Sequence, residues 1–149
     1  MMNSSFKRLE REIATGTEFE GEFIELLSPL FDGKIESCVG SYLDKEQGTD
    51  LLVDGYRFDL TTDFIHKDNT EVLEELTTCL GRFATVKVGI RTGNCHNGFT
   101  PFEKPVIVIG FLEPFQFIKR NLEAVMEELA NSFMDIFLDA TYIYDERFA

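Results

Sequence analysis

Apolar residues recur at helical spacing in three stretches of this chain. The first begins after Thr17, which forms a capping box with Glu20 three residues later, a common start of a helix. The apolar positions that follow are Phe19, Phe23, Leu26, Leu27 and Leu30. This spacing predicts an amphipathic helix that starts at residue 18 and ends near Ser28, because Pro29 removes a backbone hydrogen bond.

The second and third stretches lie further along the chain. Asn69-Thr70 opens the second, and Gly81 is suited to close it as a C-terminal cap. Its apolar positions are Val72, Leu73, Leu76 and Leu80. Pro114 fits the first turn of the third and longest helix. The stripe of that helix is Phe115, Ile118, Leu122, Val125, Leu129, Phe133 and Phe137. A short strand, Thr141–Tyr144, is predicted after it.

Runs of β-branched and apolar residues between these helices predict strands. The strands are expected at Lys34–Val39, Thr49–Val53, Tyr56–Thr62, 84–91 and 105–111. Polar loops are expected at Gly40–Gly48 and between the last two strands. The order α-β-β-β-α-β-β-α predicts an α/β fold, with a mixed α+β sheet covered by helices. No linker or repeat interrupts the chain, so we expect one domain, 1–149, with residues 1–16 as an N-terminal arm.

The turn at Asp54-Gly55 gives the sharpest local prediction. Asp-Gly between two β-type runs is typical of a two-residue hairpin turn, in which both residues adopt positive φ. Counting outward pairs Val53 with Tyr56 and, at the far end, Asp50 with Asp59. Alternation along the second strand predicts two faces. One carries Arg57, Asp59, Thr61 and Asp63, and the other carries Tyr56, Phe58, Leu60 and Thr62.

The predicted pair of carboxylates is unfavourable unless something neutralises it. Opposed residues of antiparallel strands have Cβ atoms about 5 Å apart. Two ionised carboxylates at that distance repel by about 3 kcal/mol at an effective dielectric constant near 20. Protonation of one acid, pairing with Arg57 on the same face, or a bound divalent metal would each relieve the repulsion. Pairing with Arg57 would make the site structural, whereas a metal at Asp50 and Asp59 would make it chemical.

The charge balance limits the possible partners. The chain has 14 Lys and Arg against 27 Asp and Glu, a formal charge of −13 at pH 7. A protein this acidic repels nucleic acid unless its basic residues gather in one place. Its charge either keeps it soluble or attracts a basic partner.

The thiols and the apolar runs bear on location. Cys38, Cys79 and Cys95 are odd in number and widely spaced, which indicates reduced thiols of a cytoplasmic protein. Cys95-His96 lacks further zinc ligands at a defined spacing, so an ordinary loop is expected there. No apolar run approaches the roughly 18 residues of a membrane span, and the polar start has no signal-peptide core. We therefore expect a cytoplasmic protein that does not enter the membrane.

The segment from Gly48 to Thr61 resembles a known motif. A helix with an inward glutamate, followed by three strands with an aspartate on the second and acid-x-lysine on the third, is similar to the PD-(D/E)XK nuclease superfamily. With the predicted helix and strand that follow, the resemblance covers residues 17–91. It implies a restriction-endonuclease-like α-β-β-β-α-β core. Residues 92–149 would then be an added strand and long helix.

Carried over to this sequence, the resemblance implies roles for individual residues. Asp50 and Asp59 would bind Mg²⁺ or Mn²⁺, with Glu22 of the first helix as the third catalytic acid. The metal would activate a water and stabilise charge on the scissile phosphate. Thr61 occupies the lysine position of the motif, and its neutral hydroxyl cannot supply positive charge. The lysines available to replace it are Lys67 and Lys87.

Two classes of function follow from these features. The leading hypothesis is metal-dependent hydrolysis of phosphodiester bonds in nucleic acid, or a vestigial form of it. The alternative is a non-catalytic acidic protein that binds and blocks a nucleic-acid-handling enzyme, as small anti-defence proteins of phages or mobile elements do. The charge of −13 and the missing lysine favour that alternative. Apolar residues beyond one face of the last helix would also allow a homodimer. These are Phe117, Met126, Met134 and Leu138.

Overall fold

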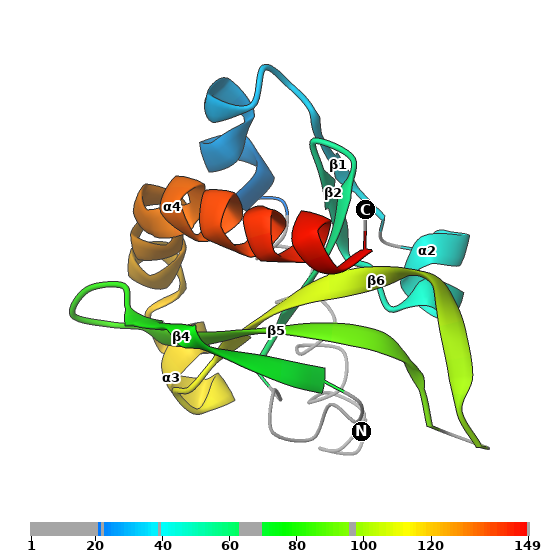
Figure 1. The fold of residues 1–149 in the computed structure, drawn as a ribbon. Helices are drawn as coiled ribbons and strands as arrows, with labels where there is room; N and C mark the ends of the chain where they lie inside the picture. Colours follow the sequence, from blue (N-terminus) through cyan, green and yellow to red (C-terminus); the bar gives the residue numbers. More distant parts are fainter. Residues whose placement is uncertain (1–20, 22, 39, 63–69, 96–97, 149) are drawn as a thin grey trace, which may run out of the picture.

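The computed structural model describes residues 21–148 apart from 22, 39, 63–69 and 96–97. These residues form a mixed α+β fold, in which one six-stranded sheet has the long C-terminal helix packed across one face (Figure 1). The sheet order is β1-β2-β3-β6-β5-β4. The strands are β1 (Ile35–Ser37), β2 (Leu51–Val53), β3 (Tyr56–Thr61), β4 (Thr70–Cys79), β5 (Thr85–Asn94) and β6 (Thr100–Phe111). The mixed α+β sheet predicted from the sequence is confirmed.

Two antiparallel three-strand units make up the sheet. Strands β1, β2 and β3 pair antiparallel in chain order, and so do β4, β5 and β6. The two units meet where β6 lies parallel to β3, with Asp59 in register with Val108 and Thr61 with Gly110. Because residues paired across strands point to the same side of a sheet, these registers define its two faces.

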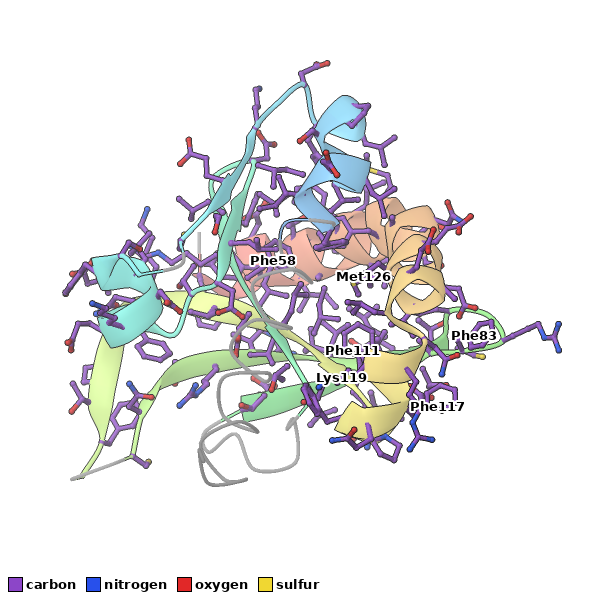
Figure 2. All side chains as sticks on the ribbon, turned by 180° about the vertical axis from the view of Figure 1, so that it is seen from behind. Phe58, Phe83, Phe111, Phe117, Lys119 and Met126 are labelled. Atoms are coloured by element: carbon purple, nitrogen blue, oxygen red, sulfur yellow. The ribbon has the colours of Figure 1, made fainter. Side chains whose placement is uncertain are left out.

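The face toward α4 (Leu122–Phe148) is lined with aromatic rings. The ring of Phe133, on α4, lies 5.2 Å from that of Phe23, 5.8 Å from that of Phe31 and 5.6 Å from that of Phe58 between centroids. Such pairs add about 0.5–1.5 kcal/mol beyond the area they bury. Figure 2 labels Phe58 and Met126, two fully buried side chains of this core. Met126 is therefore a core residue, while Leu138 is 56% exposed on the outer side of α4.

The first helix ends where the sequence predicts. Residues 21 and 23–27 are helical and continue into the 3₁₀ turn η1 (Ser28–Leu30), which contains Pro29. Asp32 and Gly33 follow with φ of 51° and 75° and direct the chain into β1. The predicted start at residue 18 lies outside the described residues.

The hairpin of β2 and β3 is confirmed together with its register. Val53 pairs with Tyr56 and Leu51 with Phe58. The turn residues Asp54 and Gly55 have φ of 50° and 85°, as this tight turn requires. The Asp-Gly pair alone carries enough local information to set the pairing.

The loop predicted at Gly40–Gly48 is wrong, because it contains the short helix α2 (Tyr42–Gln47). Its caps are visible in the sequence. Ser41 precedes the helix, although its hydroxyl donates to the carbonyl of Cys38 at 2.6 Å and makes no capping bond. The carboxylate of Asp44 accepts the N–H of Gly40 at 2.9 Å, and Gly48 ends the helix with φ of 59°. An acid three residues after a serine, with a glycine at the end, is a capping signal even over so short a span.

The helix predicted at 70–81 is also wrong, because this segment is the edge strand β4. Leu73 pairs with Val88 and Thr78 with Val86, so residues 74–77 stand opposite Lys87 alone. Such a bulge shifts the alternation of side chains. The residues that pack on the core are therefore Leu73, Leu76 and Leu80, whose spacing imitates a helix.

The strands predicted at 84–91 and 105–111 are confirmed as β5 and β6, which both extend further. Two predictions for the segment after Pro114 are wrong, namely a single long helix and a strand that follows it. The helix divides at Asn121 into α3 (Phe115–Arg120) and α4, where the Asn121 side chain donates to the carbonyl of Phe117 at 2.9 Å. The strand predicted at Thr141–Tyr144 is helical instead. The Thr141 hydroxyl donates to the carbonyl of Phe137 within the helix, which satisfies a buried polar group there.

Two carboxylates hold the connection between β4 and β5 against the helical layer. Glu128 of α4 accepts the N–H groups of Phe83 and Ala84 at 3.0–3.1 Å. Glu113 accepts the N–H of Thr85 at 2.9 Å. A Cβ atom at Gly81 would lie 2.6 Å from the carboxyl carbon of Glu128, so the chain passes closely there. The position of β4 relative to α4 thus depends on charged hydrogen bonds as well as on apolar packing.

Candidate functional site

Asp50 lies at the start of β2 and joins three strands. Its carbonyl accepts the N–H of Cys38, and its own N–H donates to the carbonyl of Phe58, both at 2.8 Å. Its carboxylate accepts the N–H of Leu60 at 3.0 Å. The paired register of β2 and β3 ends at Leu51 and Phe58, one pair before Asp50 and Asp59. The two bonds to β3 nevertheless fall on either side of Asp59, so the two acids lie on neighbouring segments.

Asp59 belongs to the face of the sheet opposite α4. Phe58 and Leu60 pack on the core beside α4, so Asp59 between them points to the other side. Its side chain is 6% exposed. This packing confirms the predicted division into two faces within β3, whereas Asp63 lies outside the described residues.

A lysine shares the face of Asp59. Gly110 of β6 pairs with Thr61 on one side and with Lys87 of β5 on the other. One face of the sheet therefore carries a row of three positions, Thr61, Gly110 and Lys87. The row spans two strand spacings, about 10 Å. Since Gly110 has no side chain, nothing on β6 separates Lys87 from Thr61 in this row. Lys87 was one of two sequence candidates for the missing cation, and Lys67 lies outside the described residues.

Arg57, the cation that the sequence offers to the acid pair, contacts Gln47 and Glu103. Its guanidinium lies 3.5 Å from the Gln47 side-chain oxygen and 3.6 Å from the carboxylate of Glu103. The Arg57 side chain is only 11% exposed. It thus contributes to a contact between the hairpin, α2 and β6, a role that the sequence did not predict.

Gln47 organises that contact. Its side-chain oxygen accepts the N–H of Glu103 at 2.6 Å, and its amide donates to the Tyr42 hydroxyl at 3.3 Å. The Tyr42 hydroxyl donates in turn to the Glu103 carboxylate at 2.7 Å, and this bond raises the pKa of Tyr42. A single buried amide thereby fixes α2 against β6. The caps of α2 are the sequence signal that would have located this group.

The carboxylates fit part of a magnesium or manganese site. Such ions prefer oxygen ligands, and Mg²⁺ is commonly held by one or two carboxylates while it keeps several waters. The Asp50 carboxylate accepts the N–H of Leu60, and an ionised carboxylate offers several acceptor positions on its two oxygens. Glu22, the third acid implied by the resemblance, lies outside the described residues. Within the described ranges, no group of three or more His, Cys, Asp and Glu side chains is close enough to hold an ion.

Other sequence candidates take ordinary positions. Cys38 is buried, Cys79 and Cys95 are exposed, and no disulfide links these three described residues. His66 and His96 lie outside the described residues, so a zinc site at Cys95-His96 is not tested. Across residues 21–148 with their gaps, no helix is both long and apolar enough to cross a membrane.

No family model matches the chain, and comparisons with curated proteins and with solved structures find no match. What the protein does must therefore follow from the chemistry of its own residues.

Proposed function

We propose that this protein binds a divalent metal at Asp50 and Asp59 and hydrolyses phosphodiester bonds of nucleic acid there, on a variant of the restriction-endonuclease-like core in which β4 replaces the helix expected at 70–81. The observation that carries the proposal is the row formed by Thr61, Gly110 and Lys87 on the face of Asp59. In this row, Lys87 offers the positive charge that the motif expects at the position of Thr61. Glu22 is the third acid of this proposal.

Each residue has a defined task in this proposal. Asp50 and Asp59 hold the ion, which when bound lowers the pKa of a water and stabilises negative charge on the phosphate. Lys87 neutralises the phosphate oxygens that become more negative as the water attacks. Thr61 contributes a hydroxyl that donates a hydrogen bond to the same oxygens. The hydrogen bond from Leu60 fixes the Asp50 carboxylate in place.

The test is cleavage of labelled DNA and RNA in the presence of Mg²⁺ or Mn²⁺. Asp59→Asn and Lys87→Met should each lower the rate by about 10²-fold or more, since each removes charge that stabilises the transition state. Lys45→Met is a matched control, because it removes one positive charge from an exposed position on α2. Wild-type cleavage that survives Asp59→Asn would contradict the assignment. A vestigial site would still bind Mn²⁺ by calorimetry, and this binding should be lost in Asp59→Asn.

A second function, binding of a basic protein without catalysis, is favoured by the distribution of charge. Strand β4 and helix α4 carry many of the exposed acids among the described residues. They are Glu71, Glu74, Glu75, Glu123, Glu127, Asp135, Asp139, Asp145 and Glu146. Association through such a surface should weaken steeply with salt. A pull-down at low salt tests this function. Recovery of a basic partner, such as a nucleic-acid-handling enzyme, supports it, and recovery of no basic protein rejects it.

A further inference from the structure

Strand β4 forms one outer edge of the sheet made by the described residues. β4 ends the sheet order, and no strand among the described residues pairs with its outer side. Most of its side chains are exposed, including Glu74, Glu75 and Thr77. An open edge presents N–H and C=O groups on which an extended chain can add a further strand.

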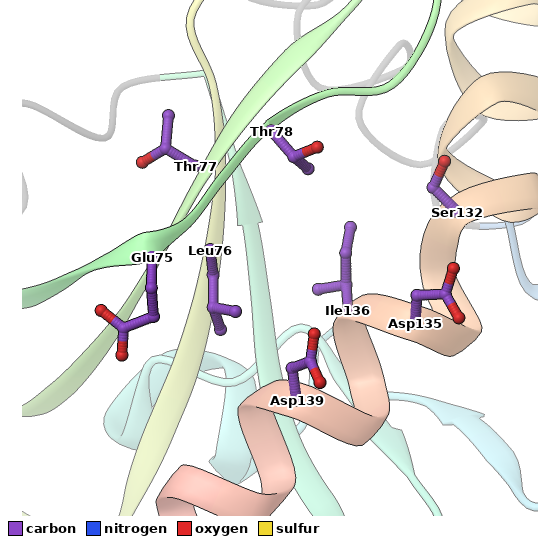
Figure 3. A pocket seen from close by; sticks show the side chains of 8 residues that line it. All are labelled: Glu75, Leu76, Thr77, Thr78, Ser132, Asp135, Ile136 and Asp139. Atoms are coloured by element: carbon purple, nitrogen blue, oxygen red, sulfur yellow. The ribbon is translucent and has the colours of Figure 1, made fainter.

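The centre of β4 departs from the ladder with β5. Residues 74–77 stand opposite Lys87 alone, outside the paired register. This bulge opens a groove of about 240 Å³ between β4 and α4. Figure 3 shows Leu76 and Ile136 between Glu75 on one side and Asp135 on the other. Asp139 also lines the groove, and none of the described residues that line it is a lysine or an arginine.

The composition of this surface selects among possible occupants. A second copy of the chain would bring Glu74 and Glu75 close to the same acids, and like charges opposite each other destabilise a strand pair. Glu71 is already paired with Arg147 of α4 at 2.6 Å. Charged side chains and bulges are the usual means by which an edge avoids its own copies. Nucleic acid would be repelled by the same carboxylates. A chain with alternating basic and apolar residues is complementary, because its cations meet the acids and its apolar side chains meet Leu76 and Ile136.

We propose that the open edge of β4 and its groove with α4 form the docking site for an extended, lysine- or arginine-bearing segment of a partner protein. The segment adds to the sheet beside β4, and its basic side chains reach Glu75, Asp135 and Asp139. This inference rests on the second function proposed above, binding of a basic protein, and is independent of hydrolysis at Asp50 and Asp59.

The experiment measures binding of a fluorescein-labelled peptide of alternating lysine and valine by fluorescence anisotropy. The full chain is compared with the triple variant Glu75→Gln, Asp135→Asn, Asp139→Asn. We expect the variant to bind about tenfold more weakly, as the loss of three partly exposed ion pairs implies. The matched control is Glu25→Gln, Glu36→Gln, Glu46→Gln, which makes the same change of net charge at exposed positions away from the groove. The control should bind as the wild type does.

A second measurement uses wild-type protein only, so it does not depend on how the variants fold. The same peptide with N-methyl groups on all of its backbone nitrogens has both edges blocked and cannot add to the sheet as a strand, so it should bind at least tenfold more weakly. Equal binding of the methylated peptide overturns strand addition. Equal weakening by both triple variants shows attraction by general charge, which overturns the groove but leaves an acidic binding function intact. If the peptide does not bind the wild type but the low-salt pull-down recovers a basic protein, the groove is not the docking site. The acidic binding function itself would stand. If the wild type forms a concentration-dependent homodimer and the triple variant at Glu75, Asp135 and Asp139 does not, the occupant is a second copy of the chain. That result overturns the proposal of a basic partner segment.

Discussion

The two faces of the sheet are built from alternate residues of the same strands, yet they differ in chemistry. Toward α4, Phe58 and Ile109 are fully buried in an apolar core. The other face carries a carboxylate, a hydroxyl and an ammonium group, which belong to Asp59, Thr61 and Lys87. These groups can bind a metal ion or form hydrogen bonds with a ligand. Neighbouring positions of β3 therefore contribute to different properties. Substitutions on the α4 face should change stability, whereas those on the opposite face should change binding or catalysis more than folding.

The largest effect is expected on the α4 face. Phe133→Ala removes a fully buried ring that contacts Phe23, Phe31 and Phe58. It should lower the free energy of unfolding by about 3–5 kcal/mol, through lost burial and the cavity that remains. Denaturant unfolding measures the change. Leu138→Ala, on the same helix but 56% exposed, is the control and should lower it by less than about 1 kcal/mol. Equal losses in the two variants would show that α4 does not pack as described.

The next effect tests how α4 holds the end of the sheet. Glu128→Ala leaves the N–H groups of Phe83 and Ala84 without their carboxylate acceptor. Hydrogen bonds to charged groups contribute about 1.5–3 kcal/mol, so the free energy of unfolding should fall by about that amount. Glu127→Ala removes an exposed neighbour as the control. Hydrogen exchange should also accelerate at Phe83 and Ala84 in Glu128→Ala, and unchanged exchange there contradicts the contact.

A smaller effect separates structure from chemistry at Asp50. Asp50→Ala removes the acceptor of the Leu60 N–H and should cost about 1–3 kcal/mol of unfolding free energy. Asp50→Asn retains an oxygen that can accept this bond, so its loss of stability should be smaller. Both variants lose the charge that a metal needs. If hydrolysis is the function, both should be inactive although only the alanine variant is clearly less stable. An asparagine variant as active as wild type rejects the metal site.

The smallest effect concerns alkaline pH. The Tyr56 hydroxyl donates to the Asp145 carboxylate at 2.7–2.9 Å, and this bond is the main reason why the pKa of Tyr56 is raised above 10.0, followed by burial. The folded state thus favours neutral Tyr56, so the contribution to stability is complete below pH 10 and is lost as the pH rises through the folded pKa. Tyr56→Phe should make stability fall less steeply above pH 10. Thermal unfolding measured as a function of pH checks this, and identical slopes contradict it.

Local chemistry determines how much of this fold could be predicted. The hairpin at Asp54-Gly55 was predicted with its register because the turn and the alternation lie within a few residues of each other. β4 was predicted as a helix because its bulge places inward residues at helical spacing. The candidate acids came from the hairpin, but the row of Thr61, Gly110 and Lys87 depends on parallel pairing of β3 with β6. No local pattern specifies that pairing. The sequence could therefore identify Lys87 as a candidate for the missing cation, but it could not show that Lys87 lies on the same face as Asp59.

The parallel pair of β3 and β6 also has a consequence for the order of folding. Each three-strand unit contains contacts between neighbours in the chain, which close short loops and form early. The pair of β3 with β6 joins residues far apart in sequence, such as Leu60 and Ile109, and so closes a much larger loop. This junction should set the folding rate, with the two units assembling first and docking last. The face that carries Asp59 and Lys87 would then be completed only in that final step.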